Sequence, residues 1–138
     1  MTLRMIETKP GESWSAYTLN GEITLILKHS ATPRPLKRDR GAFRWQFTLG
    51  ADQIKQLSAA NSWLGLVCGS PRLGRKAPME VCLLGPDDID RLIDKSSLAQ
   101  QSIHVKYLPG KSLRASSPKL DELVVPRNRL DTWDIPGS

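Results

Sequence analysis

The sequence predicts an α+β domain built on a mostly antiparallel or mixed sheet of about six to seven strands, with two short helices. Short segments in which apolar side chains alternate outnumber the segments with helical spacing. Clusters of glycine and proline separate these segments, as is typical of folds with many turns. The chain has 138 residues, 39% of them hydrophobic and 25% charged, which fits one globular domain.

The first elements form an expected hairpin. Residues 22–29, "EITLILKH", alternate between an apolar face and a mixed face, which is typical of a strand. The dipeptide Asn20-Gly21 precedes this strand, and Asn-Gly favours a tight hairpin because both residues tolerate positive φ. We therefore expect residues 13–19 to form the partner strand.

The central part of the chain combines a loop, a strand and a helix. Residues 29–41 have loop composition, since they hold two prolines, a glycine and a cluster of charges. Residues 43–49, "FRWQFTL", alternate strictly and predict a strand with one buried face. Apolar residues three apart then predict a short helix over residues 51–60.

Two apolar strands, a helix and two further strands follow. Residues 62–68 are a continuous apolar run, which indicates a strand buried on both faces, and residues 79–84 are expected to form the neighbouring strand. A helix over residues 86–95 can begin at its proline, because proline at the first helical position loses no hydrogen bond. Alternation predicts strands over residues 102–108 and 112–117, so the expected order is β-β-β-α-β-β-α-β-β.

We expect residues 1–115 to form a single α+β domain and residues 116–138 to form an extended C-terminal tail. Three prolines stand in this tail and disfavour regular elements. The tail is expected to pack on the domain or to trail from it, with residues 123–125 held against the body and Trp133 as an anchor.

Positive charge is concentrated in two segments, residues 28–44 and 69–78. The chain carries 20 Lys and Arg against 14 Asp and Glu, a formal net charge of +6. Nine of the 20 cations fall in these two segments, beside a single acid, Asp39. They are Lys28, Arg34, Lys37, Arg38, Arg40, Arg44, Arg72, Arg75 and Lys76. If the fold brings the segments together, they form a positive surface suited to polyanions.

Patterns for catalysis, metals and cofactors are weak. Cys68 and Cys82 lie in apolar runs without the close pair spacing of zinc sites, so we expect core thiols, with a cross-strand disulfide as the alternative. Residues 69–76 imitate P-loop spacing, but no helix is expected to start there. His29 and His104 do not form the pattern of a triad. We expect no catalytic residue, no metal and no cofactor.

One family resemblance covers residues 43–94. The runs "FRWQFTLGADQIKQL", "SWLGLVCG" and "MEVCLLGPDDIDRLID" resemble, in their order of elements, the closing part of restriction-endonuclease-like (PD-(D/E)xK) domains. In that family a preceding strand carries a Glu-x-Lys pair. The nearest counterpart here runs from Ile26 to Lys28, with isoleucine at the carboxylate position. The resemblance implies a nuclease-like fold without the catalytic motif.

The leading hypothesis is a non-catalytic accessory module that binds DNA or RNA through the nine cations, in a larger nucleic-acid-processing complex. The alternatives are a protein-interaction module that binds an acidic partner, with residues 118–138 as docking element, and a degenerate nuclease-fold protein. No run of 18 apolar residues occurs, and the first residues lack the apolar stretch of a signal peptide. These two features predict a cytoplasmic protein with no membrane partner.

Overall fold

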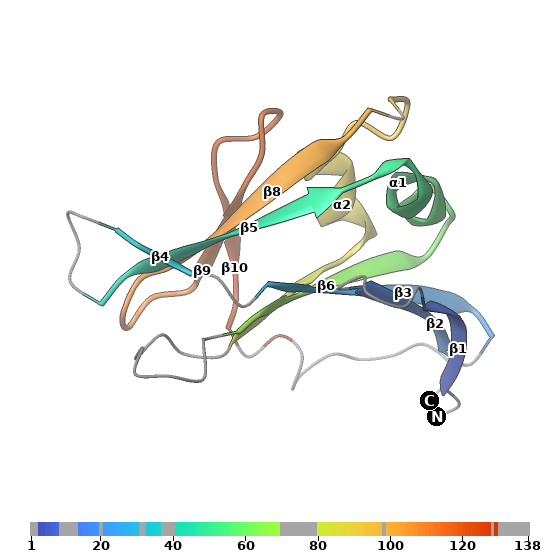
Figure 1. Ribbon diagram of the computed structural model, residues 1–138, viewed down its shortest axis with the longest axis horizontal. Helices are drawn as coiled ribbons and strands as arrows, with labels where there is room; N and C mark the ends of the chain where they lie inside the picture. The colour runs from blue at the N-terminus through green and yellow to red at the C-terminus, as the bar shows by residue number, and fades with distance from the viewer. Residues whose placement is uncertain are drawn as a thin grey trace.

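The computed structural model contains two five-stranded sheets and two short helices around a common core (Figure 1). The chain is α+β, and all of its strand pairs except one are antiparallel among the residues that the structure describes. The described residues are 3–8 (main chain only), 14–19, 21–30, 33–36, 41–69, 80–97, 99–127 and 129.

The first sheet has the strand order β1-β2-β3-β6-β7. Its strands are β1 (Leu3–Thr8), β2 (Trp14–Leu19), β3 (Ile23–Ser30), β6 (Ser62–Cys68) and β7 (Glu80–Leu84). Gly21, in the turn before β3, has a φ of 71°, which glycine adopts without strain. Strands β3 and β6 are parallel, and parallel neighbours need a long crossover connection. Here that crossover passes through the second sheet.

The second sheet has the strand order β10-β9-β8-β5-β4 and is antiparallel throughout. Its strands are β4 (Arg34–Pro35), β5 (Phe43–Leu49), β8 (Gln101–Tyr107), β9 (Leu113–Ser116) and β10 (Leu123–Val125). The chain enters this sheet from β3, leaves it after β5 and returns after β7. The two sheets are therefore interleaved in sequence, and both contribute to one core.

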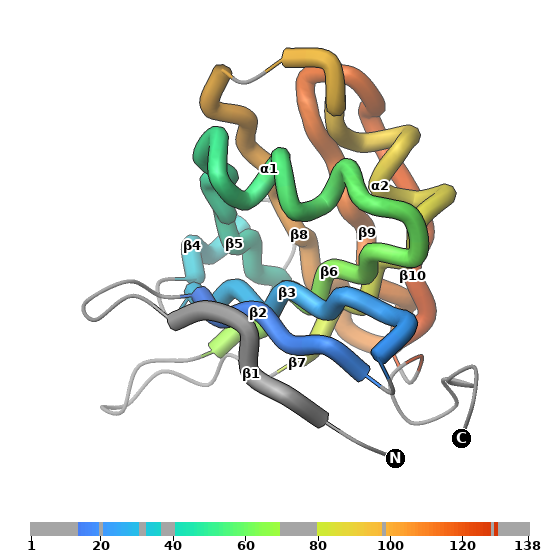
Figure 2. Tube along the Cα trace, turned by 90° about the vertical axis from the view of Figure 1, so that its right-hand side faces the viewer, coloured from blue at the N-terminus to red at the C-terminus, as the bar shows by residue number. Residues whose placement is uncertain are grey.

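The helices α1 (Ala51–Leu57) and α2 (Pro86–Leu92) stand at two of these crossings. Helix α1 packs on β3 and β6, and α2 packs on β6 and β7, so both cover the same side of the first sheet (Figure 2). Both helices begin at a glycine whose N–H donates to a side chain in the first turn, Gln53 in α1 and Asp88 in α2. These contacts satisfy main-chain donors that a helix start leaves open.

The core between the sheets takes alternate residues from both. Trp45 of β5 is fully buried, and its indole N–H donates to the carbonyl of Gly69 at the end of β6, over 2.8 Å. Cys68 and Cys82 are buried free thiols, which confirms the expected core position. Burial, with a smaller effect of Asp88, raises the pKa of Cys82 to about 12. Burial also raises the pKa of Cys68, so both cysteines act as small apolar residues.

The opposite face of the first sheet is also apolar. Leu19, Ile23, Leu25 and Leu83 form a second buried cluster, packed against Tyr17, Leu27 and Trp63. These residues alternate with core residues along their strands, so they point away from the shared core. The first sheet is therefore covered on both faces.

Side chains fasten the segment after β10 to the first sheet. Arg127 donates to the buried carboxylate of Glu80 on β7, over 2.8 Å from Nε. Arg129 pairs with Asp88 of α2 at 2.7 Å and donates to the main-chain oxygen of Leu83 on β7 at 3.3 Å. Charge-assisted bonds of this kind are among the stronger hydrogen bonds in proteins.

The α+β class and both helices are confirmed, but the strand count and order were wrong in detail. The described residues form ten strands, in the order β-β-β-β-β-α-β-β-α-β-β-β, because β1, β4 and β10 add to the expected seven. The strands also divide into two sheets, since β5 pairs with β8 rather than with β3.

The C-terminal expectations fall partly within the described residues. The expected domain boundary at residue 115 falls inside β9, and residues 123–125 form β10 beside it. Ser117, in the same segment, donates from its hydroxyl to the carbonyl of Leu92 at the end of α2, over 2.6 Å. Trp133 lies outside the described residues.

Candidate functional site

Four cations lie side by side across the outward face of the second sheet. They lie on four strands that are neighbours in the sheet, one cation on each of β4, β5, β8 and β9. We call this set the cation row: Arg34, Arg44, Lys106 and Arg114. Their neighbours along each strand, such as Trp45 and Val105, point into the core.

The pairing register aligns the row. Arg34 stands opposite Arg44, Arg44 opposite Lys106, and Lys106 opposite Arg114. Directly opposite residues of antiparallel strands project on the same face. Since neighbouring strands lie about 4.8 Å apart, the four positions span about 14 Å. Val124 of β10, opposite Arg114, continues the row and is 57% exposed.

Like charges in this arrangement repel one another. Directly opposite like charges destabilise a sheet, in a range where one pair is worth about 0.2–1 kcal/mol. Arg114 is offset by Glu122, which lies 2.7 Å away. Within the described part of the chain, no carboxylate forms an ion pair with Arg34, Arg44 or Lys106. Among the residues that the structure describes, the exposed part of the row thus has no compensating carboxylate.

The next row on the same face is polar and uncharged near neutral pH. Gln46, His104 and Ser116 stand opposite one another on β5, β8 and β9. Partial burial, and then the nearby charge of Arg44, lowers the pKa of His104. His104 is half-buried and lies on β8 two residues before Lys106 of the cation row.

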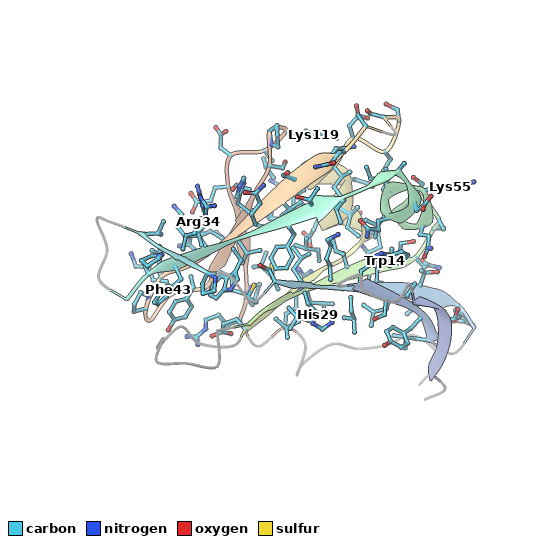
Figure 3. The ribbon with its side chains drawn as sticks, in the orientation of Figure 1. Trp14, His29, Arg34, Phe43, Lys55 and Lys119 are labelled. Carbon is cyan, nitrogen blue, oxygen red and sulfur yellow. The ribbon has the colours of Figure 1, made fainter. Side chains whose placement is uncertain are left out.

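A small pocket adjoins one end of the cation row. Its described lining is formed by Arg34, Arg44, Gln46 and Thr48, and its volume is ≈ 240 Å³. Arg34 comes from β4 and the other three from the outward face of β5. Figure 3 shows Arg34 near one end of the longest axis of the molecule and Lys55 of α1 near the other.

Of the nine cations predicted from the sequence, the structure brings two together. Arg34 and Arg44 are adjacent in the cation row. Lys28 lies apart on β3 of the first sheet, where its ammonium donates to Oε1 of Gln53 in α1 over 3.1 Å. The remaining six lie outside the described residues: Lys37, Arg38, Arg40, Arg72, Arg75 and Lys76.

Sequence reasoning missed Lys106 and Arg114 as members of the site. Each is a single cation on the polar face of a short strand, so neither stands in a charge cluster. The available signal was the alternation itself, which places Arg44, Lys106 and Arg114 on the outward faces of their strands. The register that aligns them depends on pairing across about sixty residues of sequence and could not be read locally.

The described residues offer little for catalysis. None of their His, Cys, Asp and Glu side chains form a group of three that could hold a metal ion. Glu80 is occupied by Arg127, and Glu22 is exposed in the turn before β3. Ile26, at the position of the carboxylate in the nuclease-like resemblance, is fully buried in the core.

Comparisons with protein-family models, with curated proteins and with solved structures find no match to this chain. The family resemblance of residues 43–94 therefore stays a prediction. No helix in the described ranges is long and apolar enough to cross a membrane. The cation row is the feature from which a function can be argued.

Proposed function

We propose that the protein binds nucleic acid through its phosphates, along the cation row on the outward face of the second sheet. The observation that supports this proposal is the alignment of four cations on four consecutive strands. A nucleic-acid strand carries one negative charge per nucleotide, so it presents a matching series of anions. Cationic side chains that neutralise phosphates release condensed counterions, which drives binding.

Electrostatic repulsion within the cation row indicates that these residues serve a purpose other than stabilising the fold. Three cations without a carboxylate partner among the described residues repel one another across β4, β5 and β8. Neutral or oppositely charged residues at these positions would stabilise the sheet. In the unbound protein this repulsion lowers stability. A bound polyanion neutralises the cations, and relief of the repulsion then contributes favourably to the free energy of binding.

The side chains on the outward face of the second sheet suit contacts to the nucleic-acid backbone rather than recognition of bases. The described strand residues on this face carry cations, hydroxyls, an amide and an imidazole, and Val124 is the exposed large apolar residue. Glu122, beside the face, pairs with Arg114. The aromatic residues of β5 and β8, such as Phe43 and Trp45, lie on the opposite face. Phosphate contacts position a protein without reading sequence, so we expect binding to be largely independent of base sequence.

A salt titration with matched charge reversals tests this proposal. We expect Arg44→Glu combined with Lys106→Glu to weaken binding of single-stranded DNA and RNA about tenfold or more at low salt. The slope of log affinity against log salt should become shallower by about one for each lost phosphate contact. Each single reversal, Arg44→Glu or Lys106→Glu, is also measured, and its control is Lys55→Glu, which makes the same charge change as one single reversal on an exposed helix position far from Arg34 (Figure 3).

Three results would contradict the proposal. One is that the wild-type protein fails to bind either nucleic acid at low salt. Another is that Lys55→Glu weakens binding as much as each reversal in the cation row, which would mean that only the net charge matters. Stronger binding of an acidic polypeptide than of nucleic acid, lost in the double reversal, would assign the row to an acidic protein partner instead.

A further inference from the structure

The pocket beside the cation row differs from the rest of that face because it is hollow. Its described lining residues are Arg34 and Arg44, which carry guanidinium groups, Gln46, which carries an amide, and Thr48, which carries a hydroxyl. No carboxylate is part of the described lining. All four side chains can donate hydrogen bonds, and the two arginines carry full positive charge.

This set of donors suits a phosphate group. Guanidinium groups bind phosphate oxygens in pairs of parallel hydrogen bonds, and neutral amide and hydroxyl donors can serve the remaining oxygens. Gln46 is exposed and Thr48 half-buried, so both are accessible from solvent. The side chains come from two adjacent strands of one sheet, which gives them a fixed spacing.

The size of the pocket restricts what can enter. Pockets that enclose whole cofactors or drug-sized ligands measure about 300–1,000 Å³. At ≈ 240 Å³ this pocket is smaller, so it suits a single phosphate group with part of its attached sugar.

The charge of the pocket distinguishes between two kinds of phosphate. An internal phosphodiester carries one negative charge, whereas a phosphomonoester carries about 1.5 to 2 near neutral pH. Two neighbouring guanidinium groups without a carboxylate in the described lining match the dianion better. In nucleic acids, a phosphomonoester occurs only at the end of a strand.

We propose that this pocket binds the terminal phosphate of a nucleic-acid strand, whose following phosphates lie along Lys106 and Arg114. This inference rests on the proposed function, because the strand is held by the same cation row. It adds a preference for one chemical form of the strand end, which the row alone does not provide. Arg34 and Arg44 then serve the terminal group, and the other two cations serve internal phosphates.

The test uses single-stranded oligonucleotides of one sequence and of about eight nucleotides, within the site sizes of other small single-strand binders. They carry a 5′-phosphate, a 3′-phosphate or hydroxyls at both ends. We expect one of the two phosphorylated forms to bind about five- to tenfold more tightly than the hydroxyl form, at equal total charge of the internal phosphates. The ratio of these two affinities is the readout.

Variants of the pocket should change this ratio. Gln46→Leu and Thr48→Val remove neutral donors without changing any charge, and each should lower the ratio toward one. Thr24→Val is the matched control, since Thr24 is a half-buried strand residue on the first sheet. Circular dichroism and thermal unfolding should show that all three variants are folded.

Each outcome has a defined meaning. Salt-dependent binding of all three oligonucleotides with equal affinity would overturn the terminal-phosphate pocket and leave the proposed function standing. Absence of binding to any oligonucleotide would overturn both. A phosphoserine peptide that gains affinity over its unphosphorylated form, while the oligonucleotide ends make no difference, would assign the pocket to phosphorylated protein and overturn the inference. Equal competition by inorganic phosphate against all three forms would also overturn it.

Discussion

The outward faces of the two sheets differ, although both sheets share one core. The first sheet carries Leu19, Ile23, Leu25 and Leu83 on its outward face, and these residues are buried. The second sheet carries the cation row on its outward face, and three of the four cations are exposed. The first sheet thus buries apolar side chains on both of its faces, whereas the second sheet contributes one face to the shared core and keeps a charged face that opposes stability and suits binding.

The largest expected effect is a difference in the free energy of unfolding between two truncations, one on the outward face of each sheet. Leu83→Ala should lower the free energy of unfolding by about 2–5 kcal/mol, because Leu83 is fully buried outside the shared core. Val124→Ala, on the outward face of the second sheet, should change it by less than about 0.5 kcal/mol. Urea unfolding of both variants measures the contrast. Similar losses in the two would show that the faces do not differ in this way.

The second prediction concerns the connection between the sheets. Trp45→Phe leaves the carbonyl of Gly69 without its indole donor in a buried environment. We expect a loss of about 1–3 kcal/mol from the unpaired acceptor, beyond the loss of ring volume. Phe47→Leu, on the same face of β5, removes ring volume without a hydrogen bond and is the control. If thermal unfolding shows a smaller loss for Trp45→Phe than for the control, the bond contributes little to joining the sheets.

The third prediction is a substitution that stabilises the protein, whereas most substitutions destabilise it. Arg44→Thr should raise the free energy of unfolding by about 0.2–1 kcal/mol, because it removes repulsion from both neighbours in the row. The gain should shrink as salt is added, since exposed charges are screened. Gln46→Thr controls for strand propensity on the same face. The same Arg44→Thr variant should bind nucleic acid more weakly, and a variant that loses stability instead would contradict the cost assigned to the row.

The smallest expected effect is a pH dependence that passes through His104. Its pKa is lowered by partial burial and by Arg44, so the imidazole is neutral near pH 7. The unfolded chain therefore binds the proton more readily, and stability is lost as the pH falls below the ordinary histidine range. Its cross-strand partners Gln46 and Ser116 are uncharged, and the charged neighbours Arg44 and Lys106 are positive.

Binding should respond to pH in the opposite direction. Bound phosphates near the row offset the charge of Arg44 and favour the protonated imidazole of His104. The affinity for nucleic acid should therefore rise a few-fold as the pH is lowered from about 8 to about 5. Affinity measured across this range for the wild type and for His104→Gln tests the effect. The variant should lose the rise. An equal rise in both proteins would exclude His104 as its source.

The sequence predicted individual elements better than their arrangement. Strands 43–49 and 62–68 were predicted with their observed bounds, because strict alternation and an apolar run are local signals. Strand β4 is two residues long and carries no such pattern. The division into two sheets follows from which strands pair, and β5 pairs with β8 across a long stretch of intervening chain. Composition does not encode that choice directly.

The candidate site shows the same limit. Clustered charges pointed to Arg34 and Arg44, which the structure places together, and also to Lys28, which lies on the other sheet. Charge clusters report neighbours along the chain, whereas a site on a sheet consists of neighbours across strands. Lys106 and Arg114 are neighbours of the second kind.

The arginines after β10 have a consequence for association between molecules. Strand β7 is the edge of the first sheet, and an edge strand with open peptide groups can pair with a strand of another chain. In this protein the side chain of Arg129 donates to the main-chain oxygen of Leu83, and the side chain of Arg127 donates to the carboxylate of Glu80 at the start of the same strand. The contacts that fasten the C-terminal segment therefore also occupy part of this edge, which hinders pairing with a strand of another chain.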